Sequence, residues 1–247
     1  MKLIHLFIIL FLVSCSDEID RTLPSQNNDD NTNNENAINI LFIGNSLTLA
    51  NGGIDFHVQK LYEAGNPDVI VETHSVSVAG ASLKEHLMSG IAVGNINSKD
   101  WDYIILQENG VIATINPEET IESILAFKEE INTSTSVYLF MTWAYEGQPE
   151  MTEQLSSVYY EASELTNYNV IPVGLGWRDL TNENKEIELL HSDGVHPTTS
   201  GTFYASSMIF SILSNQNIFQ VDYNGGIPSN RAKLIKQSVL ESIQLYY

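Results

Sequence analysis

The sequence predicts an α/β fold with three layers, in which helices cover both faces of a five-stranded parallel sheet. Short apolar runs, as expected for buried strands, recur along the chain, and segments with helical spacing of apolar residues lie between them. A strand, a helix and a second parallel strand form a right-handed crossover, so repeating this unit builds such a sheet. The five predicted strands are Ile38–Gly44, Val69–Val71, Tyr103–Leu106, Val137–Met141 and Val170–Val173.

The segments between and after these strands carry the signals of helices. Apolar residues share one face from Phe56 to Tyr62, and Gly65-Asn66-Pro67 ends this helix. Pro117 opens a second helix, because the N–H that proline lacks would have no partner in a first turn. We expect three further helices, at Met151–Leu165, Thr202–Leu213 and Arg231–Tyr246.

The strand order 2-1-3-4-5, which is flavodoxin-like, would make the first and third strands neighbours. The winding of the chain reverses between these two strands, and open sheets of this kind bind ligands there, at the carboxyl ends of the strands. Residues that directly follow the strands are therefore expected to form the functional site.

The composition excludes several classes of function. The 247 residues include 11 Lys and Arg against 31 Asp and Glu, for a formal net charge of −20, so a nucleic acid is not an expected partner. Cys15 is the only cysteine, which rules out an intramolecular disulfide and a zinc site built on several thiolates. No His-Glu-x-x-His pattern or clustered carboxylate spacing indicates a metal, and we expect no cofactor.

Residues 1–15 have the pattern of a secretory signal. Lys2 gives a positive start, and the apolar stretch Leu3–Val13 is shorter than the roughly 20 residues of a membrane-spanning helix. The ending Leu12-Val13-Ser14-Cys15 resembles the lipobox of bacterial lipoproteins, which implies cleavage before Cys15 and its acylation. The alternative is an ordinary signal peptide with an incidental cysteine.

Residues 16–36 are predicted to be a disordered tether rich in Asn and Asp. Residues 25–36 contain no apolar side chain, so they bury nothing that would offset the entropy of ordering them. The folded domain is expected to span residues 37–247. Together these segments predict an extracytoplasmic protein that contacts the membrane only through an N-terminal lipid, at the outer membrane or the cell surface of a bacterium.

Three residues after the strands have side chains or backbone groups suited to acyl transfer. Ser46 stands at a strand-to-helix turn, where its hydroxyl can attack and its N–H can stabilise an oxyanion, although Ser is also a common helix N-cap. Gly80 lets its own N–H approach a substrate, because no side chain intervenes. Asn109 can donate its amide to an oxyanion, although Asn-Gly also favours a simple turn.

A fourth motif, Asp193-Gly194-Val195-His196-Pro197, lies near the C-terminus. The spacing of Asp193 and His196 lets the carboxylate accept from Nδ1–H while Nε2 faces outward as a general base. A surface histidine beside a turn-forming aspartate is the alternative. His191 is the rival base, and the other histidines of the domain fall on predicted helix or strand segments, namely His57, His74 and His86.

Taken in order, these motifs resemble those of the SGNH hydrolases, also called the GDSL family. The resemblance covers about residues 38–206, and the Asp-x-x-His-Pro motif with Gly201 downstream is its most specific part. It implies the SGNH hydrolase fold and a Ser-His-Asp triad formed by Ser46, His196 and Asp193. It also implies an oxyanion hole formed by Ser46, Gly80 and Asn109.

The sequence departs from the family pattern at two places. The first motif reads Gly44-Asn45-Ser46-Leu47 where the family name describes Gly-Asp-Ser-Leu, as some members do. The third reads Gln107-Glu108-Asn109 where the family often has Gly-x-Asn-Asp. Gln107 is therefore a second candidate for the side-chain donor and for contact with the substrate.

The resemblance implies a carboxylic ester hydrolase, and we expect O-acetyl groups on carbohydrate as its substrate. A surface lipoprotein meets glycans, and three aromatic residues follow the fourth and fifth strands, where they can stack on a sugar or acyl group: Trp143, Tyr145 and Trp177. A lipase or thioesterase of the same fold and a non-catalytic surface glycan-binding lipoprotein remain the alternatives.

Overall fold

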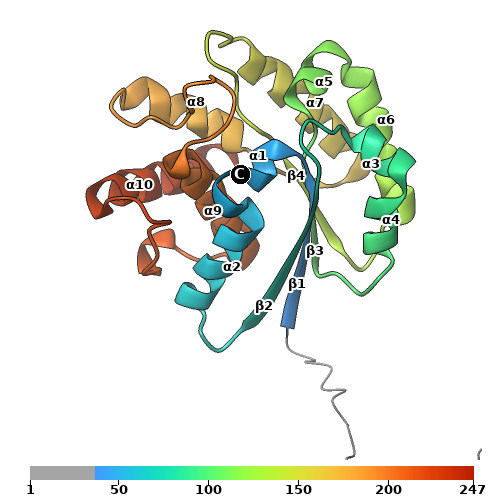
Figure 1. Cartoon of the computed structure of the whole chain (residues 1–247), viewed down its shortest axis with the longest axis horizontal. Coiled ribbons are helices and arrows are strands. Elements are labelled where there is room, and N and C mark those ends of the chain that lie inside the picture. The colour runs from blue at the N-terminus through green and yellow to red at the C-terminus, as the bar shows by residue number, and fades with distance from the viewer. Residues whose placement is uncertain (1–36) are drawn as a thin grey trace, which may run out of the picture. The chain divides into compact units, whose positions relative to one another are not determined.

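The computed structural model of the protein describes residues 37–247. The predicted signal at residues 1–15, with the lipidation residue Cys15, and the predicted tether at residues 16–36 lie outside the described residues. Figure 1 shows a central sheet with helices on both sides. The sheet consists of five strands, β1 (Ala37–Gly44), β2 (Ile70–Ser77), β3 (Tyr103–Leu106), β4 (Ser136–Phe140) and β5 (Asn169–Ile171).

The strands are all parallel and their order is β2-β1-β3-β4-β5, which confirms the predicted fold class and the flavodoxin-like order. Alternate residues of β1 point to opposite sides of the sheet. Ile40 and Phe42 pack into the core on one side, and Leu41 and Ile43 pack into the core on the other. Because helices cover both faces, the strand reads as a continuous apolar run.

Two groups of helices cover the two faces (Figure 1). On the side of Ile40 and Phe42 lie α2 (Ile54–Gly65), α8 (Val173–Glu183), α9 (Thr199–Ser214) and α10 (Ser229–Tyr246). On the other side lie α3 (Leu83–Ser89), α4 (Ile91–Ile96), α5 (Gly110–Ile115), α6 (Pro117–Glu130) and α7 (Met151–Thr166). None of the helices in the described residues is both long and apolar enough to cross a membrane.

β2 is longer than the sequence predicts. The apolar run indicated residues 69–71, whereas the strand spans Ile70–Ser77 and pairs with β1 along its whole length. β2 lies at the edge of the sheet, where one side of the strand meets solvent: Val71 is buried, while Glu72 and His74 are exposed. Because these polar side chains interrupt the apolar run, the run predicts only the first part of the strand.

α8 is not among the helices that the sequence predicts, and it contains two glycines. Gly174 and Gly176 lie inside this helix, and both sit against neighbouring groups. A Cβ on Gly174 would lie 2.0 Å from the carbonyl oxygen of Thr142, and one on Gly176 would lie 2.1 Å from the hydroxyl of Tyr204. The glycines therefore permit close packing of the helix, and Trp177 lies on it. The short helices α3, α4 and α5 were also not predicted.

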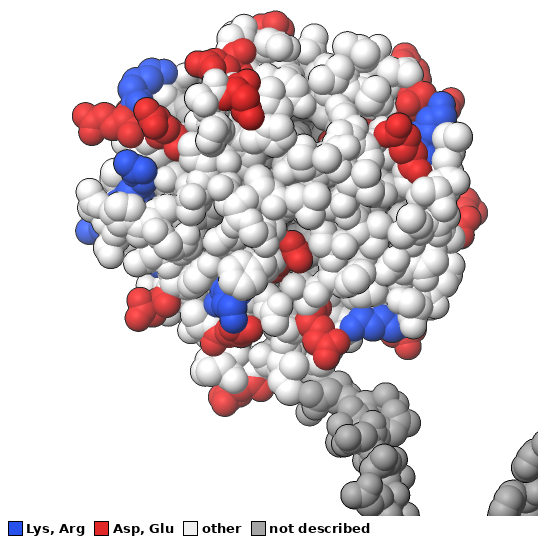
Figure 2. Space-filling view, viewed as in Figure 1, with Lys and Arg blue, Asp and Glu red and all other residues white. Residues whose placement is uncertain are grey.

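Charged side chains are dispersed over the surface. Figure 2 shows acidic side chains mainly near the rim of the viewed face, and most of the few Lys and Arg side chains visible there lie beside acidic ones. The ion pairs of the described residues fit this picture, since Lys60, Lys84, Lys99 and Arg178 each contact a carboxylate within 2.9 Å. The viewed face carries no basic patch.

Candidate active site

The residues after β1, β2 and β3 meet at the carboxyl ends of these strands, at the reversal point of the sheet. α1 (Ser46–Leu49) is a single helical turn directly after β1 and lies at this end of the sheet (Figure 1). The loop after β2 continues alongside it, because the N–H of Val78 donates to the carbonyl oxygen of Gly44 (3.2 Å). The site therefore forms where the topology of the sheet predicts it.

Ser46 is the first residue of α1, and Asn45 caps the helix. The Asn45 side chain accepts from the N–H of Leu47 (3.1 Å), and its amide donates to the carbonyl oxygen of Ala81 (3.1 Å). Asn45 thus joins the Ser46 turn to the loop that follows β2. The N–H of Ser46 lies in the first turn of the helix, where N–H groups have no carbonyl partner within the helix.

Gln107 supports the same turn through hydrogen bonds from the core side. Its Oε1 accepts from the N–H of Asn45 (2.9 Å) and from the hydroxyl of Thr48 (3.0 Å), and its Nε2 donates to the carbonyl oxygen of Glu108 (2.6 Å). The side chain is 1% exposed. The prediction that Gln107 donates to an oxyanion or contacts the substrate is therefore wrong, because its amide is buried beneath the turn.

His196 lies between Ser46 and Asp193. Its Nε2 is 2.9 Å from Ser46 Oγ, and its Nδ1 is 2.8 Å from Asp193 Oδ2. The other carboxylate oxygen of Asp193 accepts from the N–H groups of Val195 and His196, each at 2.9 Å. These two backbone N–H groups and then the His196 side chain hold the pKa of Asp193 well below its usual range, so the carboxylate is ionised at neutral pH.

Several groups hold the Asp193–His196 turn. The indole Nε1 of Trp143 donates to the carbonyl oxygen of Val195 (3.0 Å). The N–H of Glu146 donates to the carbonyl oxygen of Gly194 (2.8 Å). On the other side, the amide of Asn51 donates to the carbonyl oxygen of Pro197 (2.8 Å). The turn is thereby clamped from the β4 side and from the segment that follows α1.

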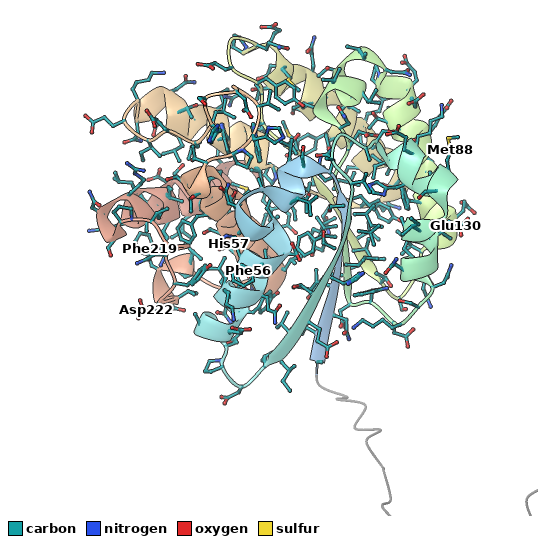
Figure 3. All side chains as sticks on the ribbon, viewed as in Figure 1. Phe56, His57, Met88, Glu130, Phe219 and Asp222 are labelled. Atoms are coloured by element: carbon teal, nitrogen blue, oxygen red, sulfur yellow. The ribbon has the colours of Figure 1, made fainter. Side chains whose placement is uncertain are left out.

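Asn51 is itself held by His57 of α2, which Figure 3 labels. Asn51 adopts a left-handed backbone conformation (φ 54°), and its carbonyl oxygen lies 3.1 Å from His57 Nε2. His57 Nδ1 lies 2.7 Å from the hydroxyl of Tyr223. Burial lowers the pKa of His57, so the ring is neutral and donates through Nε2 to Asn51.

Gly80 and Asn109 lie side by side. Gly80 is exposed with φ +74°, a conformation that favours glycine, and a Cβ there would meet nothing within 4 Å. The amide of Asn109 donates to the carbonyl oxygen of Gly80 (2.7 Å), while its Oδ1 accepts from the N–H of Val111 (2.9 Å) and caps α5. The two residues predicted to donate to an oxyanion are therefore in contact, and Asn45 links their loop to Ser46.

The two tryptophans predicted to stack on a substrate stack on each other instead. The ring centroids of Trp143 and Trp177 are 4.1 Å apart with an interplanar angle of 10°. Trp143 is fully buried and Trp177 is 3% exposed, and Tyr204 packs edge-on against Trp177. The prediction that Trp143 contacts a substrate is therefore wrong, because its ring is fully buried. Trp177 borders the cavity beside the Asp193–His196 turn, so its role as a substrate contact stays a prediction.

Tyr145 is half-buried and lines a cavity of about 790 Å³ beside the Asp193–His196 turn. Its role as a substrate contact stays a prediction. The cavity reaches His191 and Ser192, which directly precede Asp193, and its lining combines aromatic, apolar and charged residues. It includes Glu146, Trp177, Arg178, Lys185 and Leu190.

The remaining histidines do not compete with His196 for Ser46. His191 is exposed, and its Nδ1 contacts only the neighbouring Ser192 hydroxyl (3.3 Å), although Glu188 precedes it by three residues. His86 is buried on α3 and contacts the carbonyl oxygen of Gly44 (2.7 Å), and His74 lies on β2 beside Trp101. Within residues 37–247, no group of three His, Cys, Asp or Glu side chains is arranged to hold a metal ion.

Sequence reasoning missed two residues that support the site. Asn51 has no motif of its own, and only its contact with Pro197 reveals its role. Glu108 was noted only as a departure from the family pattern, but its carboxyl group is buried and accepts from the N–H groups of Leu83 and Asn109. An acidic residue two positions after a buried strand was the only available signal for it.

No protein-family model matches the sequence, and no curated protein matches it either. Solved structures do resemble it. A DUF4886 family protein from Bacteroides uniformis has a TM-score of 0.72 at 20% identity, covering 85% of this chain and 95% of that one. A protein from Slackia heliotrinireducens described as a candidate SGNH hydrolase has a TM-score of 0.63 at 22% identity, covering 72% of this chain and all of that one.

An acetylxylan esterase, Axe2 from Geobacillus stearothermophilus, has a TM-score of 0.54 at 14% identity, covering 78% of this chain and 97% of that one. These identities are low, so the likeness concerns the fold. The chain therefore has the three-layer α/β/α fold of the SGNH hydrolases.

Proposed function

We propose that this protein is a serine ester hydrolase of the SGNH type. The observation that carries the proposal is the hydrogen-bonded chain of Ser46, His196 and Asp193. The two ring nitrogens of His196 contact the serine hydroxyl and the aspartate carboxylate, each within 2.9 Å. A hydroxyl, an imidazole and an ionised carboxylate in this order are what nucleophilic acyl transfer requires. Gly80 and Asn109 lie in loops joined to the same turn, where they suit an oxyanion hole.

In the proposed mechanism, His196 Nε2 accepts the proton of Ser46 Oγ as this oxygen attacks the ester carbonyl carbon. Asp193 accepts from Nδ1–H, which keeps the ring in the tautomer that leaves Nε2 free and stabilises the imidazolium that forms. The N–H groups of Ser46 and Gly80 and the amide of Asn109 stabilise the oxyanion. Each donor contributes on the order of 3 kcal/mol to transition-state stabilisation.

The tetrahedral intermediate collapses when His196 donates its proton to the leaving alcohol oxygen, which breaks the ester bond and leaves an acyl group on Ser46. Water then attacks this acyl-enzyme, with His196 again acting as the base, and the acid and free Ser46 are released. No cofactor takes part in these steps.

Two variants test this function. Ser46→Ala is expected to abolish hydrolysis of a short-chain aryl ester, because it removes the nucleophile. Labelling by a serine-reactive phosphonate should be seen in the wild type and lost in His196→Ala. Ser134→Ala, which alters an exposed serine before β4, at the end of the sheet opposite Ser46, serves as the matched control. Wild-type turnover by Ser46→Ala would exclude this residue as the nucleophile.

We propose O-acetylated carbohydrate as the substrate. His196 must protonate the leaving alcohol, so the alcohol part of the ester lies on the histidine side, where the cavity of about 790 Å³ opens. Its lining mixes Tyr145 with polar and charged side chains, including Arg178 and Lys185, which suits a hydroxyl-rich group. That Axe2, which shares the fold, is an acetylxylan esterase supports this choice.

A lipase or thioesterase activity is favoured by a different observation. A second cavity, of about 360 Å³, lies beside Gly80 and is lined mainly by apolar residues such as Val76, Val78 and Ile91. This cavity is large enough for an acyl chain longer than acetyl.

A panel of acetylated oligosaccharides and of aryl esters with acyl chains of increasing length separates the alternatives. Highest kcat/KM on acetylated oligosaccharides supports the carbohydrate esterase, whereas an increase in kcat/KM with chain length supports the lipase. Ser46→Ala should be inactive in both arms. Saturable binding of a glycan without turnover of any ester would instead indicate a non-catalytic binding protein.

We also propose that Cys15 is acylated and anchors the enzyme to the bacterial cell envelope. The sequence ending in Leu12-Val13-Ser14-Cys15 supports this proposal. Labelling with a clickable palmitate analogue should mark the full-length chain and should fail to mark Cys15→Ser. A Cys15→Ser chain that remains labelled and bound to membranes would contradict the anchor.

A further inference from the structure

Glu108 is a buried carboxyl group between the loops that carry the proposed oxyanion donors. It lies just after β3, separated from the strand by Gln107, and is fully buried. One oxygen, Oε1, accepts from the N–H of Leu83 (3.1 Å) and from the N–H of Asn109, while Oε2 is buried without a partner among the described residues. A buried carboxyl oxygen without a partner costs stability, so its presence calls for a functional explanation.

Oε1 of Glu108 connects the two loops. Leu83 begins α3 and lies three residues after Gly80, and Asn109 carries the proposed side-chain donor. The amide of Asn109 makes a second connection, because it donates to the carbonyl oxygen of Gly80 (2.7 Å). A shift of the Glu108 carboxyl group would therefore change the distance between the N–H of Gly80 and the amide of Asn109.

We infer that Glu108 is a positioning residue that holds Gly80 and Asn109 together as an oxyanion hole, and that it does so in its protonated form. This inference rests on the proposed function. A carboxylate beside the oxyanion hole would repel the charge that develops on the carbonyl oxygen. The neutral carboxyl group accepts the same two N–H bonds through Oε1 without this repulsion.

Burial favours the neutral form. It raises the pKa of Glu108 to about 7, although the N–H groups of Asn109 and Leu83 act in the opposite direction. An unpaired neutral hydroxyl costs less in a buried site than an unpaired charged oxygen. The two protonation states therefore exchange within the pH range in which an extracellular esterase is assayed.

The groups around Glu108 also favour protonation. Glu85 of α3 and Glu119 of α6 raise its pKa further through their negative charge. Lys84 of α3 pairs with Glu119 (2.8 Å), and none of the salt bridges in residues 37–247 involves Glu108. From α7, the hydroxyl of Tyr159 accepts the N–H of Glu108 (3.1 Å) and stays uncharged, because burial raises its pKa.

The test compares Glu108→Gln and Glu108→Ala with the wild type by measuring kcat and KM on an aryl acetate between about pH 5 and 9. Wild-type kcat should fall toward alkaline pH as Glu108 ionises. Glu108→Gln keeps an acceptor but cannot ionise, so its kcat should lack the alkaline fall. Glu108→Ala loses the connection, and its kcat should be on the order of 100-fold lower at every pH, with KM little changed.

Glu122→Gln, on the exposed side of α6, is the matched control and should keep the wild-type profile. The inference is overturned if Glu108→Gln keeps an alkaline fall equal to that of the wild type, if the wild type shows no such fall, or if Glu108→Ala keeps wild-type kcat. Should Glu108→Ala fail to fold, the Glu108→Gln profile still decides. An active Ser46→Ala would defeat the proposed function itself, whereas an inactive Ser46→Ala with unaffected Glu108 variants would defeat this inference alone.

Discussion

The two halves of the proposed catalytic site are built in different ways. Asn45 and Gln107, which hold the Ser46 turn, are both at most 3% exposed, and their polar atoms bond to one another or to the loops around them. Asp193 and His196 belong to an exposed turn, and their side chains are 48% and 42% exposed. The nucleophile is positioned by burial, and the base is positioned by backbone N–H groups and clamps on an exposed turn.

This difference predicts how the halves respond to substitution. In the Ser46 half, a lost partner leaves a buried polar group unpaired, so stability and activity should fall together. In the His196 half, solvent can replace a lost side-chain partner, so activity should fall while stability changes little. Three substitutions test this expectation.

Asp193→Asn should have the largest effect on activity. The amide oxygen can still accept from Val195 and His196, but the amide nitrogen faces Nδ1 and favours the wrong tautomer of the ring, so kcat should fall by roughly 10³- to 10⁴-fold. The midpoint of urea unfolding should stay close to that of the wild type. A large loss of stability would contradict the distinction between the two halves.

The stability difference between Asp193→Asn and the wild type should also be constant from about pH 5 to 8. A carboxylate whose pKa is lowered in the folded state contributes its full stabilisation above its unfolded pKa and loses it as the pH falls through the folded pKa. The pKa of Asp193 is lowered, so this loss begins only below the ordinary carboxyl range. Urea unfolding at several pH values measures it.

Gln107→Ala should have the next largest effect, and it should change both properties. The substitution leaves the N–H of Asn45 and the hydroxyl of Thr48 buried without their acceptor, which should cost about 2–4 kcal/mol in the free energy of unfolding. Displacement of Ser46 should lower kcat as well. Gln154→Ala, at an exposed position on α7, is the control. If Gln107→Ala lost activity alone, the Ser46 turn would not depend on its buried support.

Trp143→Phe should have the smallest effect of the three. It keeps an aromatic ring in the core but removes the N–H that donates to Val195, at a cost of about 1 kcal/mol. Trp101→Phe is the matched control, because the Trp101 N–H donates to the carbonyl oxygen of Asn95 (3.0 Å), and Trp101 lies at the opposite end of β3 from Asn109. Both variants should lose similar stability, and only Trp143→Phe should lower kcat, by several-fold. Equal kcat values would show that the Val195 clamp does not position His196.

Strands that are buried on both faces could be predicted from the sequence. A strand with one exposed face could be predicted only in part. β1 and β3 contain continuous apolar runs, so they can be recognised in the sequence. In β2, buried residues are interrupted by exposed polar ones such as Glu72 and His74. α8 was missed because Gly174 and Gly176 normally signal a loop, and only the packing of the helix against Thr142 and Tyr204 explains them.

The site divides in the same way. Asp193 and His196 lie three residues apart, so a local turn brings them together, and the sequence predicted this pair. The contact of His196 with Ser46 was expected only from the order of the strands and the family resemblance. Gln107 and Trp143 were misjudged because a polar or aromatic residue after a strand can point toward solvent or into the core, and its neighbours in sequence do not determine which.

The sequence by itself determined the α/β class and the positions of the candidate acyl-transfer residues, after the strands and in one short turn. These features depend on apolar periodicity and on short-range spacing, which are local properties of the chain. Only the tertiary structure decided which of these side chains are accessible and which are buried as supports of the site. Burial and hydrogen-bond partners depend on residues far apart in sequence: Glu108 meets Leu83, Asn51 meets Pro197, and Trp143 meets Val195.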